Sequence, residues 1–124
     1  PLEGVVKTLS FGRYRAKGPM SKGARQDMGH AAVVDTGAVE VVLISRHVEP
    51  FDVNALLSVG IDPMQKRFVM LKSRVHWRAG LGQLAAATVD CAGNGVCTSD
   101  YSDLTFHRLR RPIYPLDPLT EWQP

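Results

Sequence analysis

Short apolar runs separated by glycine and proline recur along the chain and predict strands joined by tight turns. Three runs in the first half are rich in small and β-branched residues, as strands are: residues 4–9, 30–34 and 39–44. Residues 13–16 follow a turn at 10–12 and are expected to be a returning strand. Asp35-Thr36-Gly37-Ala38 separates the last two runs and favours a hairpin, because glycine tolerates positive φ. These two runs lack clean alternation of apolar and polar positions, so we expect a sheet covered on both faces.

The second half mixes helical and strand patterns. Residues 52–60 predict a helix in which Asp52 is the N-cap, Val53, Leu56 and Leu57 form the apolar face, and Gly60 ends the helix. We expect strands over 68–71, 85–89 and 106–109, a helix over 77–84, a turn or short helix over 100–105, and a proline-extended tail. Gly80 and Gly82 each cost the helix about 1 kcal/mol relative to alanine and allow another backbone to approach. The prediction is a mixed α/β fold (α+β): a mixed sheet with a few short helices packed on it, in a single compact domain.

Composition narrows the functional class. The length of 124 residues suits one domain, and 44% hydrophobic with 22% charged residues is typical of a globular protein. The net charge of +3 is too small to imply nucleic acid, and no apolar stretch reaches the ~20 residues that cross a bilayer. The chain opens on Pro1 without a signal-peptide pattern, so we expect a piece of a longer cytoplasmic polypeptide.

Neither the thiols nor the histidines form a recognisable metal-binding pattern. Cys91 and Cys97 flank a turn rich in Gly and Asn that would allow a disulfide or redox pair, but two thiols do not complete a structural zinc site. We expect free thiols in a reducing compartment. The four histidines are far apart in sequence, so we expect no metal site and no cofactor within this chain. A cluster of arginines near Tyr114 lacks interleaved aromatic residues and is expected to anchor the tail rather than to bind nucleic acid.

The segment after the predicted strand 68–71 carries the best candidate chemistry. If a helical turn begins near Ser73, that side chain caps it, and the free backbone N–H groups together with Lys72 favour an anion. His76 falls one turn later and reaches the same space. Such a place suits a carboxylate, a phosphate or a developing oxyanion. In the alternative interpretation Ser73 is only a cap, Lys72 is a solvated edge residue and His76 is a half-buried histidine with satisfied hydrogen bonds.

Two further segments have open interpretations. The loop 18–25, which begins at Gly18, carries cations and backbone freedom, so it either folds over a ligand or is a solvated connection. Arg46 and His47 follow a predicted strand and either face a site or simply end the strand in polar residues.

Three segments together resemble a known family. Residues 72–79, K-S-R-V-H-W-R-A, resemble the K-S-x-x-H-[FW]-R-A signature of the MlrC (microcystin-degradation protein) family. Gly60-Ile61-Asp62-Pro63 stands upstream as it does in that family, and residues 110–117, R-R-P-I-Y-P-L-D, resemble its closing R-R-P-I-x-P-L-D. Gly18-Pro19-Met20 and Met28-Gly29-His30 also fit, so the resemblance spans nearly the whole chain in order.

The resemblance implies a metal-dependent peptidase or amide hydrolase. A divalent metal such as zinc is held by Asp and His ligands in an N-terminal domain outside this chain, and residues 1–124 are the distal part of the C-terminal domain. This part is expected to line the substrate cleft and to be inactive alone. Lys72, Ser73 and His76 are expected to hold a substrate carboxylate or the oxyanion, with His76 also protonating the leaving amine. Arg78 and Gly18 are weaker candidates for substrate contacts. The substrate is expected to be a short peptide or another small amide.

A second function of a different class is open. The chain would then be a non-catalytic structural or oligomerisation module that packs on the N-terminal domain or on a second subunit. A homo-oligomer is compatible with both functions.

Overall fold

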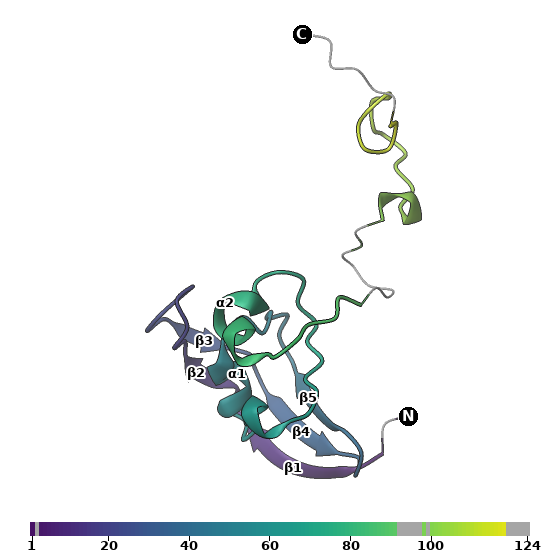
Figure 1. Cartoon of the computed structure of the whole chain (residues 1–124). Coiled ribbons are helices and arrows are strands. Elements are labelled where there is room, and N and C mark those ends of the chain that lie inside the picture. Colours follow the sequence, from purple (N-terminus) through teal and green to yellow (C-terminus); the bar gives the residue numbers. More distant parts are fainter. Residues whose placement is uncertain (2, 92–97, 99, 119–124) are drawn as a thin grey trace. The chain divides into compact units, whose positions relative to one another are not determined.

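A computed structural model describes residues 1, 3–91, 98 and 100–118 of the chain. The chain divides into two compact units, Pro1–Ala87 and Thr88–Pro124. The strands and the two α-helices all lie in the first unit (Figure 1). This arrangement confirms the predicted mixed α/β class. No described helix is long and apolar enough to cross a membrane.

A three-stranded antiparallel sheet forms the base of the first unit. It consists of β1 (Val5–Ser10), β4 (Ala31–Asp35) and β5 (Glu40–Ile44), in the order β1-β4-β5. The β4–β5 hairpin is the predicted one: Asp35 pairs with Glu40, and Gly37 takes a φ of +86° between them. The side chain of Asp35 accepts a hydrogen bond from the Gly37 N–H at 2.8 Å, which holds the turn closed.

A second hairpin lies beside this sheet. Its strands are β2 (Arg13–Arg15) and β3 (Arg25–Asp27), which pair antiparallel. β3 was not predicted, because residues 25–27 are all polar and the pattern of the preceding loop extends to Arg25. Backbone pairing with β2 makes this segment a strand despite its low intrinsic preference.

The core lies between the sheet and α1 (Val53–Leu57). The helix α2 (Trp77–Leu81) lies on the side of α1 away from the sheet (Figure 1). Asp52 is the N-cap of α1, as predicted, and Gly60 has a φ of +85° where the helix turn ends. The predicted apolar face is partly wrong: Leu56 is buried, but Leu57 is 42% exposed and Ala55 is buried instead. The core cluster comes from both hairpins, both helices and the turns that follow β3 and α1: Tyr14, Met28, Ala31, Val33, Ala55, Leu56, Val59, Ile61 and Leu81.

The other face of the sheet is apolar and exposed within the described part of the chain. The strand register places Leu9, Ala32 and Leu43 side by side, followed by Val6, Val34 and Val41. Leu9 is 79% exposed, Val6 53% and Leu43 47%. The expectation of a sheet covered on both faces is therefore wrong for the described residues, because α1 packs only on the face that carries Val33.

Three predicted strands do not form. Residues 68–71, 85–89 and 106–109 are described without strand structure, and Phe68 and Met70 are 87% and 94% exposed. A strand is stable only when it pairs, and no partner strand for these segments lies among the described residues. The predicted helix 77–84 is confirmed as α2 followed by the 3-10 turn η2 (Gly82–Leu84). The remaining short helices are η1 (Pro63–Gln65) and η3 (Tyr101–Asp103), and η3 lies where a turn or helix was predicted.

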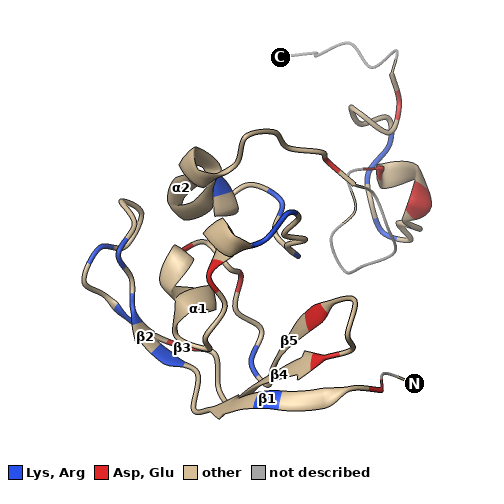
Figure 2. Ribbon diagram, turned by 60° about the horizontal axis from the view of Figure 1, so that its bottom comes forward, with Lys and Arg blue, Asp and Glu red and all other residues tan. Residues whose placement is uncertain are grey.

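A small ion-pair network joins the two edges of the sheet. Lys7 of β1 and Lys66 after η1 both contact the carboxylate of Glu40 in β5. Figure 2 shows the basic residue of β1 in blue and, in red, the acidic residues at the adjoining ends of β4 and β5. The hydrogen bonds from Lys66 and Lys7 lower the pKa of Glu40, which keeps this carboxylate ionised at neutral pH.

Candidate functional site

The buried carboxylate of Asp52 ties the loop that begins at Gly18 to the start of α1. Asp52 is only 1% exposed, and its Oδ2 accepts hydrogen bonds from the N–H groups of Lys17 at 2.9 Å and Gly18 at 2.6 Å. Its Oδ1 accepts from the Asn54 N–H at 2.8 Å, which is the helix cap. The candidate residue Gly18 therefore has its N–H engaged in packing this loop against α1.

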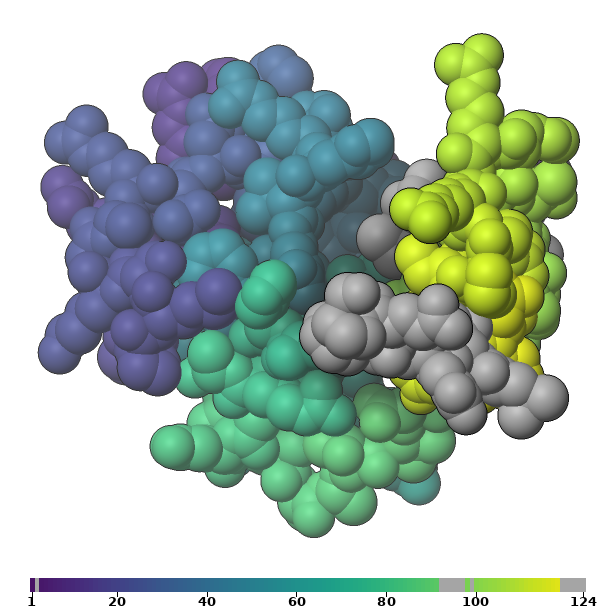
Figure 3. All heavy atoms as spheres, turned by 90° about the horizontal axis from the view of Figure 1, so that it is seen from above, coloured from purple at the N-terminus to yellow at the C-terminus, as the bar shows by residue number. Residues whose placement is uncertain are grey.

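Gly80 brings α2 into backbone contact with the same region. A Cβ at this position would lie 2.8 Å from Asp52 Cα and closer still to the Phe51 carbonyl oxygen. A Cβ on Gly18 would in turn lie 3.3 Å from Gly80 Cα. In the space-filling view the green residues around α2 lie directly against the purple and teal residues of the first half of this unit (Figure 3). The expected close approach of another backbone is thus observed at Gly80.

Two side chains of the candidate region, Ser73 and His76, meet at the carboxylate of Glu49, which local sequence patterns do not single out. Glu49 accepts a hydrogen bond from the Ser73 hydroxyl through Oε1, and its Oε2 lies 2.6 Å from His76 Nδ1. The Ser73 Oγ also accepts from the Trp77 N–H at 3.2 Å, which links the pair to the first residue of α2. The structure therefore joins Ser73 and His76 but places an internal carboxylate between them.

The position of α2 corrects one prediction. The helix begins at Trp77 rather than near Ser73, with His76 in the N-cap position but making no side-chain cap. Ser73 still satisfies one N–H of the first turn, as a cap would. The expected helical turn with free N–H donors at Ser73 does not form. Instead, the Ser73 hydroxyl and the His76 ring contact the internal carboxylate of Glu49.

The hydrogen bonds also set the charge of Glu49. Donation by Ser73 and then by His76 lowers the pKa of this carboxyl, against a smaller opposing effect of partial burial. Glu49 is thus ionised at neutral pH. The side chains of His76 and Glu49 are 53% and 33% exposed, so the imidazole remains accessible from outside.

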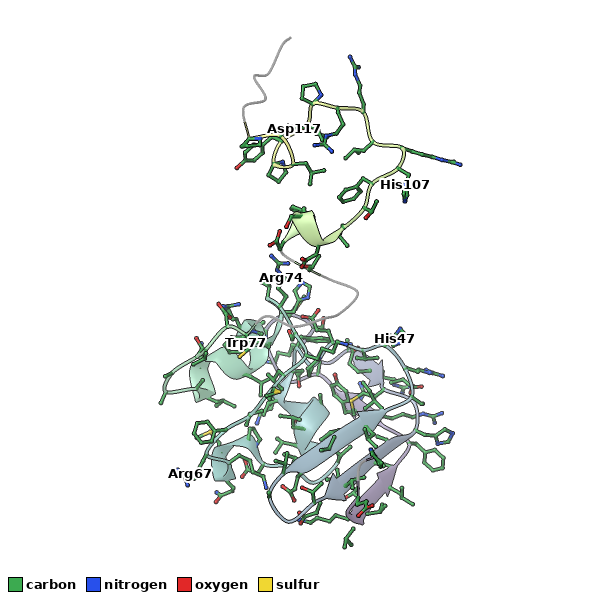
Figure 4. The ribbon with its side chains drawn as sticks, turned by 90° about the vertical axis from the view of Figure 1, so that its right-hand side faces the viewer. His47, Arg67, Arg74, Trp77, His107 and Asp117 are labelled. Carbon is green, nitrogen blue, oxygen red and sulfur yellow. The ribbon has the colours of Figure 1, made fainter. Side chains whose placement is uncertain are left out.

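The other candidate side chains of this segment are on the surface. Lys72 is exposed and has no hydrogen-bond or ion-pair partner among the described residues. The guanidinium of Arg78 lies 4.8 Å from the centre of the Trp77 ring and donates to the Arg74 carbonyl oxygen at 3.1 Å. Trp77 and Arg74 are labelled in Figure 4. Arg78 is thus held along α2.

Arg46 and His47 do not join this cluster. Arg46 forms an ion pair with Asp27 at 2.8 Å, where the Gly29 N–H and then Arg46 and Arg13 lower the pKa of the Asp27 carboxyl. His47 lies well apart from Trp77 in Figure 4. The polar strand-end interpretation therefore fits both residues.

The second unit contains its own closed loop. Arg111 Nε donates to Asp117 Oδ2 at 2.6 Å, and the Ile113 N–H donates to the same oxygen at 2.6 Å. These bonds, led by the one from Arg111, lower the pKa of Asp117 to about 2. An arginine pair was expected to anchor the tail; Arg111 alone makes such bonds among the described residues, and its partner Asp117 lies within the tail itself.

Within the described residues there is no group of three or more His, Cys, Asp or Glu side chains that could hold a metal ion. Cys91 is exposed. Cys97 lies outside the described residues, so the predicted free state of the two thiols stays a prediction. The cluster at Glu49 contains one histidine and one carboxylate, which is too few protein ligands for a typical zinc site.

Sequence reasoning missed Glu49 because nothing local marks it. It precedes His76 by 27 positions and lies in a loop with no regular spacing to the 72–79 segment. The only available signal was an acidic residue shortly before the α1 cap, in the loop that must pass close to α2.

Comparisons with known proteins give one matching family model and two similar proteins. The family model described as MlrC C-terminus matches residues 1–108. Microcystinase C from Sphingomonas sp. is 23% identical over 99 residues, which cover 79% of this chain and 18% of that protein. A crystal structure of a Mesorhizobium sp. BNC1 protein, provisionally named a metallopeptidase, shares the fold with a TM-score of 0.83 and 24% identity.

The chain is much shorter than these two proteins. It spans about a fifth of Microcystinase C, and the superposition with the Mesorhizobium protein covers 98% of this chain but 24% of the other. The family model, in contrast, matches most of the chain and includes the whole 72–79 segment. The chain therefore belongs to the MlrC C-terminus family.

Proposed function

We propose that this chain acts as part of a longer metal-dependent peptidase or amide hydrolase and lines its substrate cleft. The observation that carries the proposal is the pair formed by Glu49 and the half-exposed His76. Lys72, one residue before Ser73, is exposed and makes no hydrogen bond or ion pair with the described residues. The names of Microcystinase C and of the Mesorhizobium protein support a peptidase activity for the longer polypeptide. We expect the substrate to be a short peptide or another small amide, and the protein to act in the cytoplasm.

In this proposal Lys72 and His76 contact the substrate directly. The exposed ammonium group of Lys72 attracts a substrate carboxylate or the oxyanion that forms as the amide is attacked. His76 exchanges a proton at the reacting centre, where a positioned histidine contributes roughly 10²–10⁴ in rate. Ser73 holds Glu49 through its hydroxyl. We propose no direct substrate contact for Gly18, whose N–H binds Asp52, or for Arg78, which stacks on Trp77.

The metal of the proposed enzyme comes from outside the described residues. The resemblance implies a divalent metal such as zinc, but the described residues offer no set of three ligands that fits one. We therefore place its ligands in the N-terminal domain of the same polypeptide. This chain supplies groups that bind substrate and move protons.

The test is alanine substitution in the longer polypeptide. His76→Ala is expected to lower turnover of a peptide substrate by about 100-fold or more, and Lys72→Ala to raise KM for a substrate with a free carboxylate. Metal content, measured by elemental analysis, should stay at the wild-type level in both. Lys22→Ala serves as the control, because Lys22 is an exposed lysine in the loop between β2 and β3. Wild-type kinetics in both site variants would reject the proposal.

A second function is favoured by the exposed apolar surfaces. Leu9 and Leu43 on the outer face of the sheet, together with Phe68 and Met70, suit a module that packs on the N-terminal domain or on a second copy. In that case Leu43→Asp would release the packed partner or change the oligomeric state, whereas His76→Ala would leave turnover unchanged. The two functions thus predict opposite results for the His76 variant.

A further inference from the structure

The carboxylate of Glu49 uses its two oxygens for two different side chains. Oε1 accepts from the Ser73 hydroxyl, and Oε2 lies 2.6 Å from His76 Nδ1. Ser73 is in turn fixed to α2, because its Oγ accepts from the Trp77 N–H at 3.2 Å. The carboxylate is therefore held on one side by the loop that enters α2 and contacts the imidazole on the other.

The identity of the partner atom decides where the proton of His76 lies. An ionised carboxylate only accepts hydrogen bonds, so a nitrogen 2.6 Å from Oε2 must carry a hydrogen. A neutral imidazole has one N–H, and its other nitrogen carries a lone pair. The contact therefore assigns the proton of the neutral ring to Nδ1 and the lone pair to Nε2.

We propose that Glu49 is a positioning residue that holds neutral His76 in the Nδ1–H tautomer and presents Nε2 as the proton acceptor of the site. The proposal rests on the proposed function for its role in the reaction, and on the contact with Nδ1 for the tautomer. The side chain of His76 is half exposed, and its Nε2 makes no hydrogen bond with the described residues. Among the described residues, His76 is the only positively chargeable side chain that forms an ion pair with Glu49.

The proton balance of the reaction follows from this tautomer. Nε2 takes one proton from the attacking water as its O–H bond breaks and its oxygen bonds to the amide carbon. The π pair of the carbonyl bond moves onto the carbonyl oxygen, which becomes the oxyanion, and it restores the C=O bond when the C–N bond breaks. The ring is then an imidazolium whose charge Glu49 balances. When the C–N bond breaks, Nε2 passes the same proton to the amine nitrogen, and the neutral Nδ1–H ring is restored. Ser73 and Glu49 exchange no proton with the substrate.

The tautomer can be measured in the 124-residue chain without metal or substrate. Long-range ¹H–¹⁵N correlation spectra at a pH where the ring is neutral should show a protonated, pyrrole-type Nδ1 and an unprotonated, pyridine-type Nε2 for His76. An unrestrained histidine prefers its proton on Nε2. His47, which has no hydrogen-bond partner among the described residues, serves as the control within the same spectrum.

Two variants separate the positioning role from folding. Glu49→Ala removes the acceptor and should return His76 to the Nε2–H form that His47 shows. Ser73→Ala keeps the acceptor and should retain the Nδ1–H form, and it remains informative if Glu49→Ala fails to fold. A predominantly Nε2–H His76 in the wild-type chain would overturn the proposal.

Kinetics of the longer polypeptide link the tautomer to function. Glu49→Ala is expected to lower kcat about 10- to 100-fold with little change in KM, as loss of a partner that orients a functional histidine does. A wild-type kcat for Glu49→Ala would overturn the positioning role. If the tautomer is as proposed but His76→Ala is fully active, the proposed function fails. If His76→Ala is inactive but the tautomer is Nε2–H, the positioning role of Glu49 fails.

Discussion

Alanine at Gly80 tests the packing that brings α2 to the site. Alanine is the better helix former by about 1 kcal/mol, so helix propensity alone predicts stabilisation. The structure predicts the opposite, because the new Cβ would lie 2.8 Å from Asp52 Cα and even closer to the Phe51 carbonyl oxygen. Both are backbone atoms that cannot rotate away, so α2 must move by about 1 Å to bring the closer of them to an ordinary 3.4 Å contact.

The expected magnitude follows from these opposing effects. Overpacking costs about 1–3 kcal/mol, and backbone obstacles place this case near the upper end. After the gain in propensity, Gly80→Ala should lower the free energy of unfolding by about 1–2 kcal/mol. Gly82→Ala is the matched control, since its Cβ would lie 3.6 Å from Arg78 Cβ, an ordinary contact. That variant should be neutral or more stable by about 0.5–1 kcal/mol.

Urea unfolding followed by circular dichroism measures both variants. The midpoint of Gly80→Ala should fall and that of Gly82→Ala should stay or rise, with little change in the slope of either transition. A Gly80→Ala protein as stable as wild type would refute the reasoning, because it would mean that α2 does not lie against the Phe51–Asp52 backbone. The site would then lose the contact that fixes the helix next to His76.

Three other predictions concern the carboxylates. Asp52→Asn replaces a buried acceptor of three backbone N–H groups with an amide whose NH₂ faces donors such as the Gly18 N–H. The free energy of unfolding, measured by urea titration, should therefore fall by about 2–3 kcal/mol. A change below about 0.5 kcal/mol would contradict the assigned bonds. The folded-state pKa of Glu49 lies below its unfolded value of about 4.3. The stabilisation by its ionised carboxylate is therefore complete above that value and is lost as pH falls through the folded-state pKa. Between about pH 6 and pH 3, Glu49→Gln should lose less stability than the wild-type protein, and equal losses would contradict the lowered pKa of Glu49. In the second unit, the Ile113 amide proton should shift with an apparent pKa of about 2, that of Asp117, in pH-dependent NMR spectra, and a midpoint near the ordinary aspartate value would show that the loop is open.

Features encoded within a few residues could be predicted from the sequence. The turn at Gly37 and the cap at Asp52 depend on one side chain and on neighbouring backbone, so local pattern is sufficient. The same holds for Gly80, whose place in a helical pattern indicated a close backbone approach. The three strands of the sheet could be predicted from their apolar runs, and the β4–β5 pairing from its short turn. The pairing of β1 with β4 could not, since the segment that follows β1, β2, pairs with β3 instead.

Features that depend on distant partners could not be predicted. Glu49 meets His76 only because the loop before α1 passes beside the loop before α2, and no local spacing encodes this contact. The segment 68–71 has the composition of a strand, but strand structure also requires a neighbour to pair with, and none lies among the described residues. The polar segment 25–27 shows the reverse case, since pairing with β2 makes it a strand against its composition.

The central claim is that His76 faces the substrate of an amide hydrolase. The most direct measurement is a crystal structure of the longer, metal-loaded polypeptide with a non-hydrolysable peptide analogue bound. The account predicts His76 Nε2 within hydrogen-bond distance, about 3 Å, of the analogue at the scissile position, with Nδ1 still on Glu49. An analogue bound elsewhere, with His76 in contact only with protein or solvent, would contradict the account.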